Sequence, residues 1–154
     1  MSQEQTSAGT IFSVSIAQPA TEDVAGYEAL TWVALGTTTS LGEIGPEYQV
    51  TTYDIHGNRV TQKLKGQVNM GSQAVELVRV LNNPAQIIMK NAVTIDSATE
   101  DSIHSFKLEY KDGDIQYYQG LPISYRSSIG GPDDMISAAA AIELTSKIIE
   151  DLAA

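Results

Sequence analysis

The sequence predicts a mainly β fold with one short helix, and three patterns lead to this prediction. Apolar and polar residues alternate with a period of two in several segments, as in strands with one buried face. Glycine, asparagine and aspartate cluster between these segments, as in the turns of hairpins. One segment alone, about residues 84–94, has the apolar spacing of an amphipathic helix.

The predicted strands are rich in β-branched and aromatic residues or alternate regularly, and glycine, proline or polar residues bound them. In chain order they are the run from Ala8 to Pro19 and the segments 27–35, 47–54, 59–70, 74–81, 105–110, 115–120, 123–127 and 135–149. The last of these is ambiguous, because residues 138–141 are all alanine and favour a helix, whereas the alternation favours a strand.

Two pairs of strands are expected to form hairpins. Residues 54–58 contain a Gly and an Asn that tolerate positive φ, so the strands on either side should pair and leave a protruding tip. Residues 111–114 supply the Asp-Gly of a tight turn. Loops are expected at 41–46, which contains two glycines and a proline, and at the polar segment 97–102.

The predicted helix begins with a cap. Asn83 followed by Pro84 is typical of a helix cap and a first helical residue. The apolar residues that follow lie on one stripe, at Ala85, Ile88, Met89, Ala92 and Val93. A helix of this length is too short to be stable alone, so it should pack on a sheet.

The length of 154 residues fits one domain with a real core. We place this domain at residues 9–149, between a flexible arm at 1–8 and a frayed tail at 150–154. No apolar run approaches the ~20 residues of a membrane span, and residues 1–7 do not resemble a secretory signal. Hence no membrane anchor is expected.

Composition excludes several chemistries. The chain has no cysteine, so disulfides, thiolate metal sites and cysteine nucleophiles are excluded. Its 9 Lys and Arg stand against 19 Asp and Glu, a formal charge of -10, and the cations are scattered. Tight binding to nucleic acid needs clustered cations, so an acidic surface of this kind should repel DNA.

No candidate catalytic or metal site emerges. The two histidines, His56 and His104, have no partner nearby in sequence, and we expect both to be solvated at the surface. Acidic pairs occur at 22–23, 100–101, 112 with 114, and 133–134, but without the spacing of a calcium loop. No nucleophile elbow, phosphate loop or zinc helix is present. The expectation is a protein without catalytic, cofactor-binding or metal-ligating residues.

Several local sequences, in their order, resemble the major tail tube proteins of long-tailed, siphovirus-type bacteriophages. The matching segments are 8–14, 41–48 with 51–54, 65–67 with Gly71, and 127–134. The resemblance spans nearly the whole chain. Each segment is only moderately specific, whereas their order and spacing together are much more so.

This resemblance implies a phage tail tube fold, which is a two-sheet β-sandwich or barrel with one short flanking α-helix. It is also the main reason to assign 135–149 as a strand. The family is related to the tube proteins of contractile tails and of type VI secretion. Its members join their sheets into hexameric rings around a continuous β-barrel, and the rings stack into a hollow tube.

The implied role is structural and not enzymatic, in the phage tail of a virion made and assembled in the host cytoplasm. The implied partners are further copies of the chain and the tape-measure, tail terminator and tail tip proteins, while DNA passes through the lumen without specific binding. No cofactor is expected. The hairpin tip, and the arm at 1–8, would contact the next ring; the tip residues are Asp54, Ile55, His56, Gly57 and Asn58.

Acidic residues on polar strand faces are the candidates for the lumen, where like charge would keep DNA from sticking. These candidates are Glu109, Asp114 and Glu143. An alternative reading is a small-molecule carrier built on a closed β-barrel, with Trp32 and the tyrosines around its ligand. A third class, a carboxylate-based hydrolase, rests only on the acid content.

Overall fold

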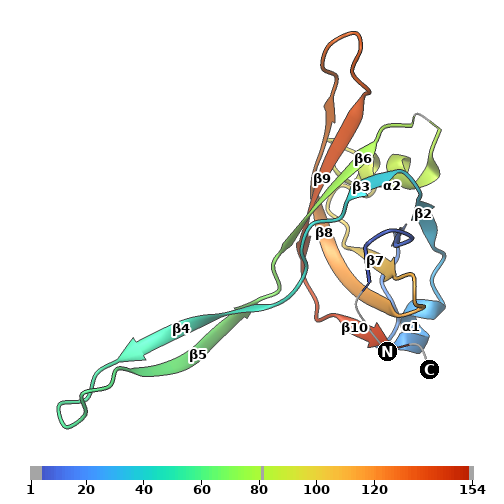
Figure 1. Cartoon of the computed structure of the whole chain (residues 1–154). Helices are drawn as coiled ribbons and strands as arrows, with labels where there is room; N and C mark the ends of the chain where they lie inside the picture. Colours follow the sequence, from blue (N-terminus) through green and yellow to red (C-terminus); the bar gives the residue numbers. More distant parts are fainter. Residues whose placement is uncertain (1–4, 81, 153–154) are drawn as a thin grey trace.

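Residues 5–80 and 82–152 are described by the computed structural model, which is mainly β (Figure 1). The elements in this part of the chain are β1 (Ile11–Ser15), α1 (Val24–Glu28), β2 (Val33–Leu35), β3 (Thr38–Ser40), β4 (Glu47–Tyr53), β5 (Gln62–Asn69), β6 (Ser72–Val78), α2 (Pro84–Ala92), β7 (His104–Glu109), β8 (Ile115–Ser128), β9 (Ser137–Leu144) and β10 (Ile149–Asp151). Within it, neither helix is long and apolar enough to cross a membrane.

The strands form two sheets, and all neighbouring strands are antiparallel. The larger sheet has eight strands in the order β2-β1-β7-β8-β9-β6-β3, with β10 paired to β8 off this path. The smaller sheet is the hairpin β4-β5, which projects from the body in Figure 1. The predicted mainly β, two-sheet class is confirmed.

The large sheet folds into two layers because β8 changes partner along its length. Its first part pairs with β7, and from Gly120 onward it pairs with β9. The register shifts between Pro122 and Ser124, where proline lacks an N–H for the ladder and a bulge bends the strand. We call β2, β1, β7 and residues 115–120 the first layer, and residues 121–128, β9, β6 and β3 the second layer.

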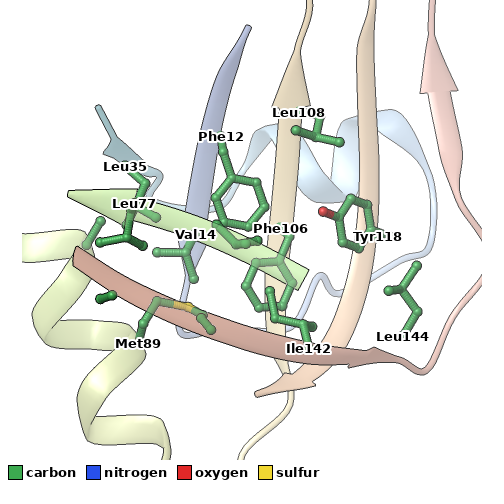
Figure 2. Close-up of a cluster of buried hydrophobic side chains, with 14 residues drawn as sticks. Phe12, Val14, Leu35, Leu77, Met89, Phe106, Leu108, Tyr118, Ile142 and Leu144 are labelled. Atoms are coloured by element: carbon green, nitrogen blue, oxygen red, sulfur yellow. The ribbon is translucent and has the colours of Figure 1, made fainter. Parts of the chain in front are cut away.

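The core lies between these layers. In the first layer the Phe106 ring stacks on Phe12 and on Tyr118, with centroids 5.6 and 5.7 Å apart. Figure 2 shows Ile142 of the second layer beside Phe106, and Leu77, also of the second layer, beside Val14 and Leu35; the strands of the second layer cross those of the first. These side chains are fully buried or nearly so. Each contributes about 1.5–3 kcal/mol of hydrophobic free energy, which makes this cluster the main stabilising contact.

Helix α2 forms as predicted and covers the core. The Asn83 side-chain oxygen accepts hydrogen bonds from the N–H groups of Ala85 (3.0 Å) and Gln86 (3.3 Å). Ala85 and Met89 are buried in the core cluster. The helix ends at Ala92, short of the predicted residue 94, because the chain leaves helical geometry at Val93.

The predicted strand at 27–35 is wrong over most of its length. Its start is helical, because the Asp23 carboxylate accepts a 2.7 Å bond from Gly26 N–H and caps α1. This bond and the Thr21 hydroxyl lower the pKa of Asp23. Tyr27 is buried because its ring stacks on Tyr117 at 5.1 Å. The aromatic composition therefore reflects burial and not a strand, and pairing with β1 is confined to Val33–Leu35.

The C-terminal strand exists but is divided. The predicted strand 135–149 contains β9, an interruption at 145–148 and the start of β10. The prediction of a frayed tail from residue 150 is wrong at its beginning, because Glu150 and Asp151 pair with Gln116 and Ile115. Residues 153–154 of that tail, and residues 1–4 of the predicted N-terminal arm, lie outside the described residues.

Both predicted hairpins are present, with adjusted limits. The turn at 111–114 joins β7 to β8 and places Gly113 at a φ of 99°. The tip between β4 and β5 extends over residues 54–61, beyond the predicted 54–58. Gly71 has a φ of 88° at the junction of β5 with β6, where a Cβ would lie 2.9 Å from the Gly45 carbonyl. This glycine lets the hairpin leave the body.

Candidate assembly surfaces

The β4-β5 hairpin, residues 47–69, is called the arm below; it is distinct from the predicted N-terminal arm at residues 1–8. Its two strands pair only with each other, and every residue of β4 is exposed. An isolated two-stranded hairpin is only marginally stable in water. An arm of this length therefore needs a surface to cover it.

Large apolar side chains on the arm are left in solvent. Val50 is 61% exposed and Leu64 is 57% exposed, and the others are Tyr48, Tyr53, Ile55, Val60 and Val68. On one face Lys65 lies 4.8 Å above the Tyr48 ring. The arm has three of the nine Lys and Arg residues but two of the nineteen acids, so it is +1 and the rest of the chain is -11. An exposed apolar surface of this kind is typical of a site that docks on another protein chain.

The predicted contact residues lie together at the end of the arm (Figure 1). Asp54, Ile55, His56, Gly57 and Asn58 are all exposed. Local bonds fix this tip, since Asn58 N–H donates to the Ile55 carbonyl at 3.0 Å and the Asn58 side chain accepts from Val60 N–H at 3.0 Å. The tip presents an apolar side chain, a carboxylate and an imidazole.

The second layer has two open edges. Residues 121–128 of β8 pair with β9 on one side, and no described strand pairs with them on the other. At the opposite edge, β3 pairs only with β6. A groove of about 280 Å³ lies beside β3, between residues 38–41 and residues 7–10. Such edges offer unpaired N–H and C=O groups to another chain.

The outer face of the second layer is lined by small side chains. Cross-strand neighbours on this face are Ala74 with Ala141, Glu76 with Ala139, Ser72 with Glu143, Val78 with Ser137, Ala141 with Ser124, Ala139 with Arg126, Ser137 with Ser128 and Leu121 with Glu143. Directly paired residues point to the same side of a sheet. This face therefore consists mostly of Ala and Ser, with two carboxylates, one guanidinium, and Leu121 and Val78 as the larger apolar side chains.

The three lumen candidates are not brought together. Glu143 lies on the outer face of the second layer, where it pairs with Ser72. Glu109 ends β7 in the first layer, and Asp114 lies in the turn that follows. Hence only Glu143 shares a face with the second-layer carboxylate Glu76, which the sequence did not suggest as a candidate.

The expectation of a solvated surface histidine is wrong for His104, which is fully buried. Its Nδ1 lies 3.0 Å from the Ser102 carbonyl, and its Nε2 has no hydrogen-bond partner among the described residues. Desolvation lowers the pKa of His104, and the bond to Ser102 opposes this shift. The sequence carried a signal, since His104, Phe106 and Leu108 alternate on one strand face.

A second buried polar contact joins the layers. The Tyr118 hydroxyl donates to the Gln73 side-chain oxygen, and both residues are buried. Gln73 also donates from Nε2 to the Leu41 carbonyl at 2.9 Å. Desolvation raises the pKa of Tyr118. This phenol is therefore a structural donor.

Metal ligation has no support in the described segments. No three His, Asp or Glu side chains there form a group that could hold a metal ion. The turn acids instead cap the backbone: Asp112 accepts from Asp114 N–H at 3.0 Å, and Asp134 accepts from Gly131 N–H at 2.8 Å.

Comparison with sequences gives no relative, because no family model and no curated protein matches this chain. Solved structures do match, and 23 chains share its fold. One, in the cryo-EM structure of the anti-feeding prophage baseplate, has a TM-score of 0.70 at 12% identity, over 96% of this chain and 97% of that one.

A second match, in an extracellular contractile injection system (PVC sheath/tube terminator, extended state), has a TM-score of 0.66 at 11% identity, over 98% of this chain and 99% of that one. A chain of the activated phage p2 baseplate has a TM-score of 0.53 at 8% identity; the match covers 90% of this chain and 45% of that chain. At such identities the likeness shows the fold alone. The fold is that of chains built into phage tails and tail-like assemblies.

Proposed function

We propose that this protein is a structural subunit that forms rings, hexameric as the family resemblance implies, and that the rings stack into the hollow tube of a phage or phage-like tail. The sequence resemblance pointed to siphovirus-type tails, and the solved chains of similar fold come from a baseplate and from a contractile injection system. The tube would belong to a siphovirus-type tail or to a contractile one. In a phage, the tail would be part of a virion assembled in the host cytoplasm.

One observation carries the proposal: the second layer has unpaired edges on both sides. Residues 121–128 form one edge and β3 forms the other. In the separate two-stranded sheet, β4 follows β3 in the chain and also has no described strand on its outer side, so we call the two together the β3-β4 edge. If the edge 121–128 of one copy pairs with the β3-β4 edge of the next, a heterologous contact repeats around a ring and closes it. The sheet becomes a continuous barrel and its exposed edges disappear.

The outer face of the second layer would line the lumen. Small Ala and Ser side chains would leave a smooth wall, and Glu76 and Glu143 against Arg126 give each copy one excess negative charge there. A wall of this kind repels DNA weakly and offers no cluster of cations for phosphate binding. DNA would pass without specific binding, while tape-measure, tail terminator and tail tip proteins meet the tube in the lumen or at its ends.

The arm would extend each subunit's contacts beyond its own edge. Its exposed apolar side chains would be covered by a neighbouring copy, and the tip at 54–58 would reach the adjacent ring. The positive arm and the negative remainder favour this contact electrostatically.

A carrier of small molecules fits these observations less well. The aromatic residues it would place around a ligand pack on one another, with Trp32 against Tyr117 at 5.9 Å. A groove of about 730 Å³ does occur, but it lies outside the core at the base of the arm, beside Glu43, Glu47 and Glu143. A lipophilic ligand would avoid these carboxylates.

Negative-stain electron microscopy of the purified protein tests the proposal. The expected result is rings or tubes with a central channel at high protein concentration. A variant in which residues 48–68 are replaced by a short Asn-Gly turn should stay folded, because the arm strands pair only with each other, but should not assemble. If the wild-type protein stays monomeric at all concentrations, or if the armless variant forms the same tubes, the proposal fails.

A further inference from the structure

Two cations converge at one end of the subunit, in what we call the basic pocket. A small cavity of about 70 Å³ is lined by Arg79, Val80, Gln86, Ile87, Lys90 and Tyr125. Burial raises the pKa of Tyr125, and the nearby positive charge of Arg79 opposes this shift. Within the described segments neither cation forms an ion pair with a carboxylate, although the chain has a net charge of -10.

The pocket has a rigid floor and an apolar rim. Gln86 is 3% exposed and fully engaged: its oxygen accepts from Val80 N–H at 2.9 Å and from the Tyr125 hydroxyl at 3.2 Å. Its nitrogen donates to Thr37 at 2.9 Å. Val80 and Ile87 on the rim remain 42% and 46% exposed. Two cations without an ion pair among the described residues, beside two exposed apolar side chains, are suited to a segment that carries carboxylates and an apolar residue.

A segment of that chemistry lies at the opposite end of the same chain. Strand pairing places Ile115 between Glu109 on one side and Asp151 on the other, and Glu28 is the last residue of α1, which contacts β10. Glu150 precedes Asp151 in β10 and points to the other face of the strand, where its carboxylate accepts from the Gln116 side chain at 3.0 Å. Leu152, which follows Asp151, is 67% exposed. We call these carboxylates together with Leu152 the acidic end.

Strand β8 shows that the pocket and the acidic end are far apart within one subunit. Its first residue, Ile115, pairs with Glu109 and Asp151. Its last residue, Ser128, pairs with Ser137, next to Ile136, whose carbonyl accepts from Arg79 N–H at 3.1 Å. In Figure 1, α1 and β10 lie at the lower end of the body and α2 lies at the upper end. The two surfaces therefore cannot meet within one chain.

We propose that the basic pocket receives the acidic end of a second copy, with Glu150 and Asp151 facing Arg79 and Lys90 and with Leu152 against Val80 and Ile87. The contact is head-to-tail and joins opposite ends of two subunits, so it can repeat from one ring to the next, which is suited to stacking. This inference rests on the proposed function and adds to the arm tip a second, charge-based contact between rings. Because its charges are partly exposed, the contact should weaken as salt rises.

Zero-length carbodiimide crosslinking of the assembled wild-type protein tests the contact. This reagent joins an amine to a carboxylate only where they touch, so the expected product is a Lys90 amide with Glu150 or Asp151, mapped by mass spectrometry. Since the two sites lie at opposite ends of a subunit, this product is intermolecular. If the crosslinks of Lys90 lead mainly to carboxylates that do not belong to the acidic end, the inference is overturned.

Charge reversal separates this inference from the proposed function. The double variant R79E/K90E should still form rings. The protein concentration at which its rings stack should rise at least about tenfold. Adding E150K and D151K should restore stacking, because the charges are then complementary again. Tubes of R79E/K90E that match wild type would overturn the inference and leave ring formation standing. A wild-type protein that forms no rings would overturn both.

Discussion

The contribution of the arm can be worked out at Leu64. Burying a leucine completely is worth about 1.5–3 kcal/mol, and Leu64 is 57% exposed in the single subunit. Covering it with a neighbour should therefore contribute about 1–2 kcal/mol to each subunit contact. Leu64→Ser should remove most of this and weaken each contact about tenfold, since 1.4 kcal/mol corresponds to a factor of ten.

Sedimentation velocity measures the protein concentration at which rings appear. Urea unfolding of the dissociated subunit measures its stability. The free energy of unfolding should change by less than about 0.5 kcal/mol, because Leu64 is largely exposed and lies in β5, which pairs only with β4. Ile16→Ser is the matched control, because Ile16 is 53% exposed but lies after β1. Assembly of Leu64→Ser equal to wild type, or equal losses in both variants, would refute the reasoning.

Three further predictions concern the body of the fold. Asn83→Ala removes the cap of α2 and should cost about 1 kcal/mol, measured by urea unfolding; an unchanged midpoint would contradict the capping role. Tyr118→Phe leaves the buried Gln73 oxygen without its donor and should cost about 1–3 kcal/mol by the same method, whereas a neutral result would contradict this contact. His104 has a folded pKa below its usual 6.5, so the unfolded state takes up the proton first and stability should fall as pH falls from 6.5 towards the folded pKa. Chemical unfolding between pH 7.5 and 5 measures how the free energy of unfolding depends on pH. His104→Gln should reduce this pH dependence. An equal pH dependence in the variant and the wild type would disprove the burial argument.

Local signals in the sequence were sufficient for some elements. Asn83 and Pro84 placed the start of α2, because a cap and a fixed φ act within a few residues. The Asp-Gly of 111–114 placed the β7-β8 turn for the same reason. Composition did not distinguish a strand from a helix at 27–35, because Tyr27 is buried by a tertiary contact with Tyr117.

The assembly surfaces were only partly predictable. The hairpin tip at 54–58 could be found from its turn residues, but the length of the arm and its lack of cover depend on where the rest of the chain packs. The open edge at 121–128 follows from the change of partner along β8, which no local pattern encodes. The basic pocket joins residues from three separate segments around Gln86 and Tyr125, so spacing in the sequence could not reveal it.

Hydrogen exchange of the backbone amides in residues 121–128 tests the central claim most directly. In the dissociated subunit, the amides that point away from β9 should exchange rapidly, because no described strand pairs with them. In the assembled protein the same amides should become as protected as those bonded to β9. Equal and rapid exchange in both states would show that this edge stays open, and the ring built on it would be excluded.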